Sequence, residues 1–279
     1  MTKTKGEVMK EKFVLCVFGM LIGHSLWGQK DISGLVLSGS GKRPIEYVNI
    51  GIVGKNVGTV TNEKGEFDLF LESRYENDSL LFSCIGYEPY VAEISEIREG
   101  ETIFLKEMAY NLGEVEVRPK VFKESLLGVK TTSKSISAGF QHNMLGYECG
   151  ILMQVKKSAI LKKVNINVSS CSYDTIFYRL NVYRVKDEKT FENILRKPIY
   201  ISASKELLED TFSVDLMPHD ITVDGDFLVT LEHIKDLGEG ELVFCSSKKH
   251  TTYFRKTSQG EWQTAPVGVS ISVVVDVEK

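Results

Sequence analysis

Short apolar runs separated by polar turns dominate the chain, and long stretches with a helical spacing of apolar residues are nearly absent. The runs are rich in Val, Ile, Phe and Tyr and recur about every 8–12 residues, with Gly, Asn and Asp between them. This pattern is typical of β-sandwiches and barrels, so it predicts an all-β protein. A length of 279 residues favours two domains.

The first half contains eight runs with strand character, separated by residues that favour turns. The predicted strands are 32–37, 47–53, 58–61, 66–71, 79–84, 90–94, 102–105 and 114–117. Between the third and the fourth, Asn62-Glu63-Lys64-Gly65 provides a glycine where a tight hairpin needs positive φ. The pattern therefore predicts one β-sandwich over residues 30–118.

The second half also predicts strands, after a segment with a different composition. Residues 119–138 are rich in Lys, Ser and Thr, which favours a linker, with a short helical turn around residues 121–127 as an option. Residues 139–279 then predict a second β-sandwich, of the jelly-roll or galactose-binding-like type, with one helical turn at 205–209. Its predicted strands are 144–154, 159–168, 177–185, 199–201, 211–216, 226–232, 242–245, 252–255 and 269–277.

The first 28 residues are typical of a secretory signal peptide. Lysines precede the apolar run 13–22, which is about half as long as a membrane-spanning helix requires, and a small residue, Gly28, follows. Without this segment the chain has 30 basic and 36 acidic residues and no basic stripe interleaved with aromatic residues. We therefore expect an exported protein with no transmembrane segment in its mature part and no nucleic-acid partner.

Five cysteines are present, and Cys16 lies within the predicted signal peptide. Cys84 and Cys245 lie in strand-like apolar runs, where buried free thiols are the commoner state. A bridge between Cys149 and Cys171 is the alternative that an oxidising compartment permits. No Cys or His spacing indicates a metal site.

A group of motifs in the first half resembles a known family. These motifs are Ile32-Ser33-Gly34-Leu35-Val36, Gly58-Thr59-Val60-Thr61-Asn62-Glu63-Lys64-Gly65-Glu66-Phe67 and Ile85-Gly86-Tyr87, in that order. Their order and spacing resemble the carboxypeptidase regulatory-like domain, a seven-stranded prealbumin-like sandwich. The residues themselves indicate a structural role, because Gly58 and Gly65 suit special backbone geometry and Phe67 and Leu69 would face the core from one strand.

Domains of this family follow the catalytic domain of zinc carboxypeptidases or open TonB-dependent outer-membrane receptors. Residues 111–117 resemble the segment that follows the domain in those receptors. The 162 residues after Val117 are too few for a plug and a barrel of 22 strands at about 10 residues each, so we expect a different second unit. The resemblance implies a Gram-negative cell envelope, in the periplasm, at the outer membrane or at the cell surface.

Motifs for catalysis are missing from the sequence. None of the five histidines begins an H-x-x-E or H-E-x-x-H motif, and no nucleophile elbow, P-loop or dinucleotide fingerprint is present. Four carboxylates, Asp215, Asp220, Asp224 and Asp226, fall within twelve residues. They leave a calcium site open as an alternative to a solvated turn. We expect no cofactor and no enzymatic activity.

Aromatic residues near a polar loop are the candidate binding residues. Tyr253 and Trp262 flank the loop 256–261, where an indole ring at the edge of a sandwich could stack on a sugar or anchor a partner. The structural alternative is that Trp262 covers the core from its rim.

The sequence therefore predicts a non-catalytic binding or accessory module that contacts an envelope protein or a glycan through its second unit. One alternative is an assembly subunit that pairs through strand edges. Another is a hydrolase with an unrecognised carboxylate site, for which Asp224 and Asp226 are the candidates.

Overall fold

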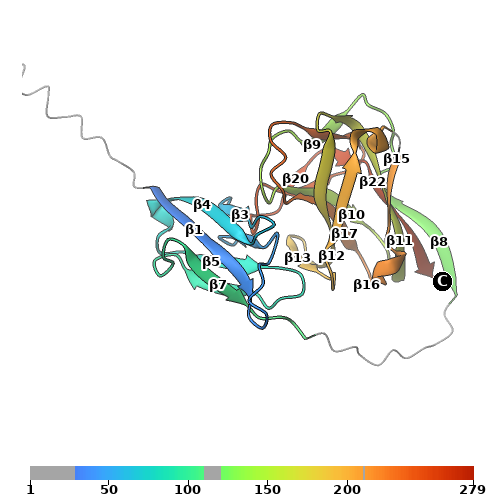
Figure 1. The fold of residues 1–279 in the computed structure, drawn as a ribbon. Coiled ribbons are helices and arrows are strands. Elements are labelled where there is room, and N and C mark those ends of the chain that lie inside the picture. Colours follow the sequence, from blue (N-terminus) through green and yellow to red (C-terminus); the bar gives the residue numbers. More distant parts are fainter. Residues whose placement is uncertain (1–28, 110–120, 210) are drawn as a thin grey trace, which may run out of the picture.

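A computed structural model describes residues 29–109, 121–209 and 211–279. Across these ranges the protein consists of β-strands and three short 3₁₀ turns, with no α-helix (Figure 1). The prediction of an all-β protein is thereby confirmed. The signal peptide, residues 111–117 and the eighth predicted strand of the first half lie outside the described residues.

The N-terminal unit is a sandwich of seven strands in two small sheets. One sheet has the order β4-β1-β7 and the other the order β3-β2-β5-β6. The strands are β1 (Gln29–Ser38), β2 (Asn49–Gly51), β3 (Gly58–Val60), β4 (Glu66–Glu72), β5 (Ser79–Ser83), β6 (Tyr90–Glu93) and β7 (Glu101–Leu105). They coincide with the first seven runs predicted from the sequence.

The inward-facing residues of this sandwich follow from the alternation along each strand. In β4 every second side chain is buried, so Phe67 and Leu69 face the core as predicted. The turn before β4 is held by Asn62, whose Oδ1 accepts hydrogen bonds from the backbone N–H groups of Lys64 and Glu66 at 2.8 and 3.0 Å. Gly65 adopts the positive φ of 76° that the hairpin requires.

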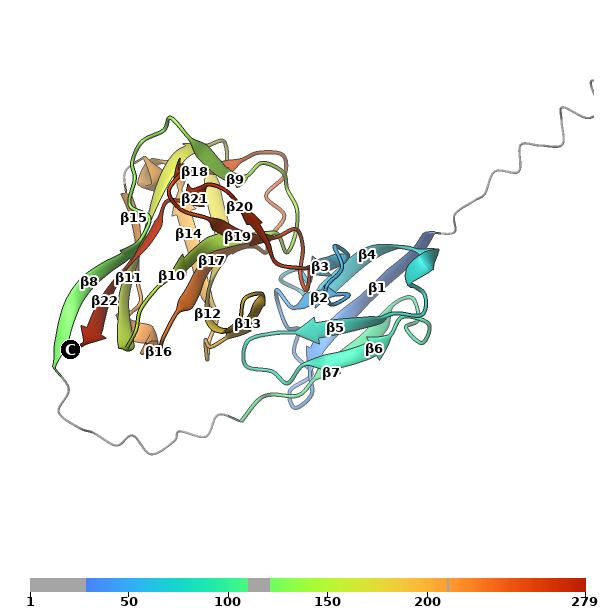
Figure 2. The same ribbon diagram turned by 180° about the vertical axis from the view of Figure 1, so that it is seen from behind.

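The C-terminal unit is a larger sandwich of a seven-stranded and an eight-stranded sheet (Figure 2). The first has the order β13-β12-β17-β10-β19-β20, with β14 also paired to β12. Its strands are β10 (Glu148–Met153), β12 (Thr175–Asp187), β13 (Thr190–Asn193), β14 (Ile199–Ser204), β17 (Phe227–His233), β19 (Thr252–Arg255) and β20 (Gln263–Ala265).

The eight-stranded sheet has the order β21-β18-β11-β22-β8, with β15 and β16 also paired to β11 and β9 to β18. Its strands are β8 (Phe122–Gly128), β9 (Ser137–Phe140), β11 (Ser158–Cys171), β15 (Thr211–Asp215), β16 (Thr222–Asp224), β18 (Leu242–Ser247), β21 (Gly268–Val269) and β22 (Ile271–Glu278). The main hydrophobic core of the protein lies between these two sheets. The 3₁₀ turn Lys205–Leu208 lies where a helical turn was predicted.

The prediction of a linker over residues 119–138 is wrong where the structure describes that segment. A helical turn was an option for residues 121–127, but Phe122–Gly128 forms β8, which pairs antiparallel with β22. The strand alternates between half-buried and exposed positions, and only one of its side chains, Leu127, packs against the core. An edge strand with so few apolar residues gives a weak sequence signal, which is the reason for the error.

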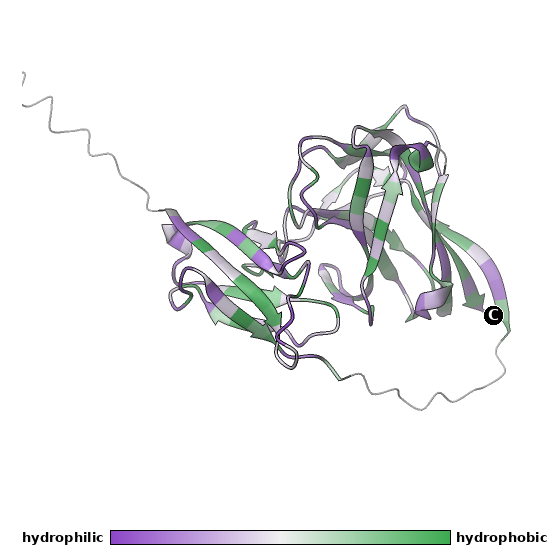
Figure 3. Ribbon diagram, in the orientation of Figure 1, coloured by the Kyte–Doolittle hydropathy of each residue, from purple (hydrophilic) through white to green (hydrophobic). Residues whose placement is uncertain are grey.

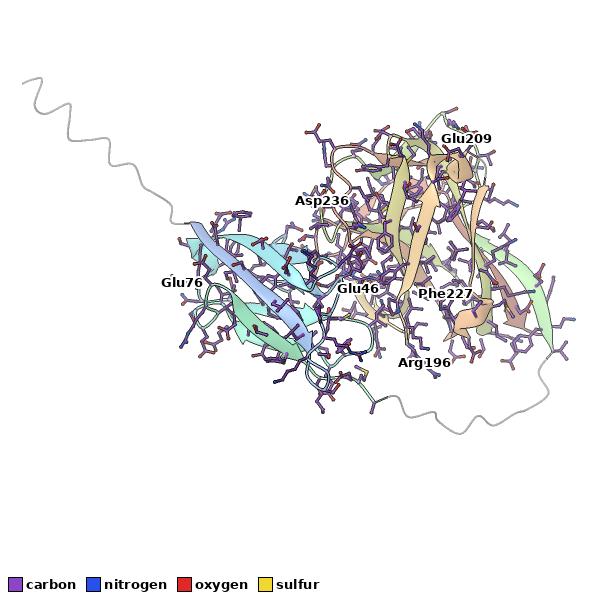
Figure 4. All side chains as sticks on the ribbon, viewed as in Figure 1. Glu46, Glu76, Arg196, Glu209, Phe227 and Asp236 are labelled. Carbon is purple, nitrogen blue, oxygen red and sulfur yellow. The ribbon has the colours of Figure 1, made fainter. Side chains whose placement is uncertain are left out.

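The two units are in contact, and an aromatic cluster lies between them. Tyr47 of the N-terminal unit packs against Phe177 and Tyr200 of the C-terminal unit, with each pair of ring centroids 5.4 Å apart. Strands in Figure 3 alternate between hydrophilic and hydrophobic residues, and Figure 4 shows Glu46 where side chains of both units crowd together. Glu46 hydrogen-bonds Tyr200, whose pKa is raised mainly by burial.

A tight backbone contact holds the units together beside this cluster. The Ser258 carbonyl oxygen approaches Gly51 and Gly58 so closely that a Cβ on either glycine would lie 2.4 or 2.5 Å from it. The Gly54 N–H donates to the Gln259 carbonyl at 2.9 Å, and Gln259 Nε2 donates to Ser83 Oγ at 2.7 Å. The glycine of the G-T-V-T motif therefore has two requirements, the docking of Ser258 and the close approach of the Ile50 carbonyl oxygen, 2.7 Å from a Cβ at Gly58, in its own sheet.

No helix in the described parts of the chain is long and apolar enough to cross a membrane.

Candidate functional site

A row of four buried charged residues crosses the seven-stranded sheet on the face directed away from the core. Strand register places Arg179 of β12 opposite Glu232 of β17, Glu232 opposite Glu148 of β10, and Glu148 opposite Arg255 of β19. These side chains are at most 9% exposed. We call these four residues the charged row.

Each carboxylate in the charged row is flanked by a guanidinium. Glu232 Oε2 accepts hydrogen bonds from Arg179 Nε at 3.0 Å and Nη2 at 2.8 Å, and from Asn181 Nδ2 at 2.7 Å. Glu148 accepts from Arg255 Nε at 2.8 Å, from Tyr183 OH at 2.9 Å, from Asn181 Nδ2 at 2.9 Å and from Thr230. Burial of these charges is therefore largely compensated, although Glu232 Oε1 accepts no hydrogen bond from the described residues and lies 3.9 Å from Arg255 Nη2.

The row also connects the two units. Arg179 Nη1 donates to the Tyr47 carbonyl oxygen at 2.8 Å, and Arg179 Nη2 donates to Asn49 Oδ1 at 2.6 Å. Tyr47 presents its carbonyl from a left-handed backbone conformation with φ of 55°, which is uncommon for a bulky residue. The N-terminal unit thus supplies acceptors that Arg179 would otherwise lack in a buried position.

The two carboxyl groups have different electrostatic environments. Burial raises the pKa of Glu148, and the facing Glu232 carboxylate raises it further. Arg255 acts in the opposite direction but does not outweigh them. Burial also acts to raise the pKa of Glu232, but Arg179 and Arg255 outweigh it and lower that pKa. Two like charges in adjacent strands therefore ionise at different pH values.

A cavity of about 450 Å³ lies between the units and against the charged row. The C-terminal unit contributes Arg179, Asn181, Tyr183 and Arg255 to its wall, and the N-terminal unit contributes Asn49. Neither carboxylate of the row lines it. The wall therefore combines guanidinium, amide and hydroxyl groups with the carboxylate of Glu192 and with apolar residues such as Ile194 and Leu195.

Both predicted binding residues, Tyr253 and Trp262, line a second, open pocket of about 650 Å³. Phe191 of β13 lies between them, with ring centroids 5.6 Å from Tyr253 and 5.2 Å from Trp262, and all three rings are half-buried. The rim carries Lys189 and Glu261, which form an ion pair at 3.6 Å. We call this the aromatic pocket.

The aromatic pocket adjoins the charged row through its tryptophan. The Arg255 guanidinium lies 5.1 Å from the centre of the Trp262 ring, and Tyr183 packs edge-on against the same ring at 5.8 Å. Because Arg255 is fixed by Glu148, the orientation of the indole depends on the row beneath it. Trp262 therefore both covers buried residues and lines the pocket.

The clustered aspartates have structural roles. Asp224 accepts a hydrogen bond from Ser158, Asp226 accepts one from the Val155 N–H at 2.9 Å, and Asp215 accepts one from the Met217 N–H at 3.0 Å. Among the described residues, no three or more His, Cys, Asp or Glu side chains gather where they could hold a metal ion.

The four cysteines of the described chain, Cys84, Cys149, Cys171 and Cys245, are free thiols, so the alternative of a Cys149–Cys171 bridge is not realised. Cys84 lines the interdomain cavity, and burial raises the pKa of its thiol to about 11.

Sequence reasoning missed the charged row and Phe191. The available signal was the order Phe177-Tyr178-Arg179-Leu180-Asn181-Val182-Tyr183, in which polar and apolar residues alternate. Such alternation normally indicates a solvated face, so the sequence gave no reason to expect that this face is buried.

Comparisons with known proteins agree with this architecture in the first half of the chain. Residues 32–117 match the CarboxypepD_reg-like domain family. A stretch of 154 residues is 25% identical to the TonB-dependent receptor SusC of Bacteroides thetaiotaomicron, which corresponds to 53% of this chain but only 15% of that receptor.

Likeness to solved structures is weak. A protein of unknown function from Bacteroides fragilis aligns over 90% of this chain and 98% of its own, with 11% identity and a TM-score of 0.22. The infectious bursal disease virus VP2 particle protein covers 84% of this chain and 61% of its own, with 8% identity and a TM-score of 0.19. Scores this low carry no argument about the C-terminal unit.

The protein is thus a two-unit all-β protein in which a small sandwich is docked on the polar face of a larger one. Its N-terminal unit is a carboxypeptidase regulatory-like domain, as the sequence motifs predicted.

Proposed function

We propose that this protein is an exported, non-catalytic binding module of a Gram-negative cell envelope, and that its C-terminal unit binds a glycan through the aromatic pocket. The observation that carries the proposal is the arrangement of Phe191, Tyr253 and Trp262 around an open pocket of about 650 Å³. Aromatic faces next to polar groups are suited to sugars, which present apolar C–H faces and hydroxyl edges.

The surroundings of the pocket support a binding role. Glu188, Lys189 and Glu261 supply charged hydrogen-bonding groups around the aromatic rings. The Trp262 ring is held from below by Arg255 and Tyr183, which reduces the conformational entropy that binding would cost.

The absence of catalysis is part of the proposal. The carboxylates that lie close together, Glu148 and Glu232, have fully buried side chains and are paired with arginines. A glycosidase needs an acid and a base that reach the scissile bond from either side. The envelope location is supported by the predicted signal peptide and by the similarity to a TonB-dependent receptor.

The proposal is tested by titrating neutral and acidic mono- and oligosaccharides into the protein and following binding by calorimetry. We expect Trp262→Ala and Tyr253→Ala each to weaken binding about tenfold, as the loss of one stacking platform implies. Tyr90→Ala is the matched control, because Tyr90 is a partly exposed tyrosine of the other unit. Unchanged affinity in both pocket variants would overturn the glycan site.

A second candidate function is assembly through a strand edge. β6 lies at the end of the order β3-β2-β5-β6, and its Tyr90 and Val91 are 43% and 60% exposed. Exposed apolar residues on an unpaired edge favour the addition of a strand from another chain. Sedimentation velocity at increasing concentration tests this, with Val91→Lys expected to abolish any oligomer; a concentration-independent monomer would remove self-assembly from consideration.

A further inference from the structure

The interdomain cavity receives polar side chains from both units. Asn49 and Ser83 come from the N-terminal unit, and Asn181, Tyr183, Arg255 and Gln259 come from the C-terminal unit. Its volume of about 450 Å³ is within the range of small-molecule sites. The cavity therefore exists only while the two units are docked.

The polar side chains around the cavity are buried and fixed. Asn49, Asn181, Tyr183 and Arg255 are 8%, 1%, 6% and 8% exposed. Asn181 and Tyr183 donate to Glu148, while Asn49 accepts from Arg179, so their positions are set by the charged row. An occupant with hydroxyl groups can hydrogen-bond such fixed polar groups while its C–H faces contact the apolar wall residues Ile85, Ile194 and Leu195.

Hydrogen-bonding capacity remains on both the donor and the acceptor side. Asn49 uses Oδ1 for Arg179, and no described residue accepts a hydrogen bond from its Nδ2. Arg255 uses its Nε and Nη2 groups for the Glu148 carboxylate. Gln259 donates through Nε2 to Ser83, and no described residue donates to its Oε1. A hydroxyl group, which donates and accepts, fits such a mixed set, whereas an anion would only accept.

The charge of the wall also favours a neutral occupant. Arg179 and Arg255 are each matched by a carboxylate of the charged row. Glu192 at the cavity wall is paired with Lys186 at 2.8 Å. No unmatched cation is therefore left to balance the charge of a carboxylate or phosphate ligand.

We infer that the interdomain cavity is a second binding site, which takes a neutral sugar unit through hydroxyl hydrogen bonds to Asn49, Arg255 and Gln259. This site is separate from the aromatic pocket, and binding of a sugar to it does not require binding in that pocket. Phe191 lines both spaces, so the sugar unit is either a free saccharide or the end of a chain whose next units lie in the aromatic pocket.

The test fills the cavity without removing any of its hydrogen bonds. Met108 lines the cavity from the N-terminal unit and is 39% exposed, so Met108→Trp adds volume there. Met217→Trp is the matched control: Met217 is 56% exposed and lies in the 3₁₀ turn Met217–His219, between two strands of the eight-stranded sheet. The probes are glucose, galactose, mannose and N-acetylglucosamine and their linear di- to hexasaccharides, titrated by calorimetry.

We expect the Met108→Trp variant to lose at least about tenfold in affinity for the saccharide that the wild type binds best, while the Met217→Trp variant binds as the wild type does. Binding of a monosaccharide that survives Trp262→Ala identifies a free sugar as the ligand. Binding of oligosaccharides alone, weakened by both Met108→Trp and Trp262→Ala, identifies the end of a glycan. Unaltered affinity in Met108→Trp, or no binding of any probe by the wild type, overturns the inference.

Protection of a thiol locates the sugar without a mutation. Cys84 lines the cavity, whereas Cys171, at the end of β11, does not, and both thiols are half-buried and free. We expect saturating saccharide to slow alkylation of Cys84 by iodoacetamide and to leave Cys171 unaffected, as read by mass spectrometry. Equal effects on the two cysteines, or an effect on neither, would contradict the assignment. Protection of Cys84 that persists in the Trp262→Ala variant separates failure of the aromatic pocket from failure of this site.

Discussion

The two faces of the seven-stranded sheet are both buried at the charged row but have opposite chemistry. One face packs Leu231 and its apolar neighbours against the eight-stranded sheet. The other face carries Glu232 and the charged row, and the N-terminal unit covers it. Leu231 and Glu232 are adjacent in sequence and are 2% and 0% exposed.

The difference between the faces concerns specificity. An apolar face gains stability from any close-packed partner, because burial of apolar area is not directional. A buried polar face is stable only when its donors and acceptors are paired. Because Arg179 donates to the Tyr47 carbonyl and to Asn49 Oδ1, few other positions of the N-terminal unit would satisfy it. The apolar face therefore determines that the large sandwich forms, while the polar face determines how the small one docks.

The largest expected effect comes from breaking the charged row. Glu232→Gln leaves Arg179 buried without its charge partner, which we expect to cost about 3–5 kcal/mol of the free energy of unfolding. Urea denaturation measures this loss. Glu148→Gln should cost less than half as much, because Glu232 Oε1 lies only 3.9 Å from Arg255 Nη2 and can compensate. Equal losses in the two variants would contradict the asymmetry between the carboxylates.

Truncation on the apolar face sharpens the comparison. We expect Leu231→Ala to cost about 3 kcal/mol through lost burial and the cavity that it leaves. Unlike the loss in Glu232→Gln, this loss should be nearly independent of salt concentration, because no charge is exposed or unpaired. Urea denaturation at low and high sodium chloride tests this; an equal salt dependence in both variants would contradict it.

The docking contact can be disturbed without touching either face. A Cβ on Gly58 would lie 2.5 Å from the Ser258 carbonyl oxygen of the other unit and 2.7 Å from the Ile50 carbonyl oxygen of its own sheet. We therefore expect Gly58→Ala to displace both neighbours, to move the units apart and to cost about 1–3 kcal/mol. Small-angle X-ray scattering should report a larger radius of gyration. Gly41→Ala is the control, because its Cβ would meet only the flexible Arg43 side chain, at 3.2 Å, and Ser38 Oγ, at 3.4 Å. An unchanged radius in Gly58→Ala would mean that the contact does not determine the docked arrangement.

The pH dependence of stability gives the smallest of these effects. The lowered pKa of Glu232 contributes stability above the unfolded pKa of about 4.3, and this contribution is lost as pH falls through the folded value. The raised pKa of Glu148 acts in the opposite direction, so its contribution declines as pH rises from about 4.3 to the folded value.

Glu148→Gln should remove this decline in the free energy of unfolding and keep the loss in acid. Urea denaturation from pH 3 to pH 8 measures the free energy of unfolding in both the acid range and the range above it. An unchanged slope above pH 4.3 would contradict the raised pKa of Glu148.

Much of the fold was predictable from the sequence because its strands alternate strongly. The strands β1 to β7 follow from apolar runs such as the one that buries Phe67 and Leu69. The strands that were not predicted are β8, β9, β13, β16 and β20, because short or edge strands such as Phe122–Gly128 and Thr190–Asn193 bury few side chains.

The candidate site was only partly predictable. Tyr253 and Trp262 were found because aromatic residues near a loop stand out in a sequence. Phe191 and the charged row were not, because cross-strand register and docking decide which polar residues become buried. Glu148 and Glu232 lie far apart in the chain, and nothing local to either marks them as neighbours.

The close contact of Gly51 and Gly58 with the Ser258 carbonyl oxygen has a consequence for the order in which the two units fold. Synthesis proceeds from the N-terminus, and N-terminal domains generally fold first. The surface that receives Ser258 is therefore complete long before the loop that fills it emerges. We therefore expect the last hairpin of the chain and its tryptophan to reach their final positions by packing against a small sandwich that has already folded.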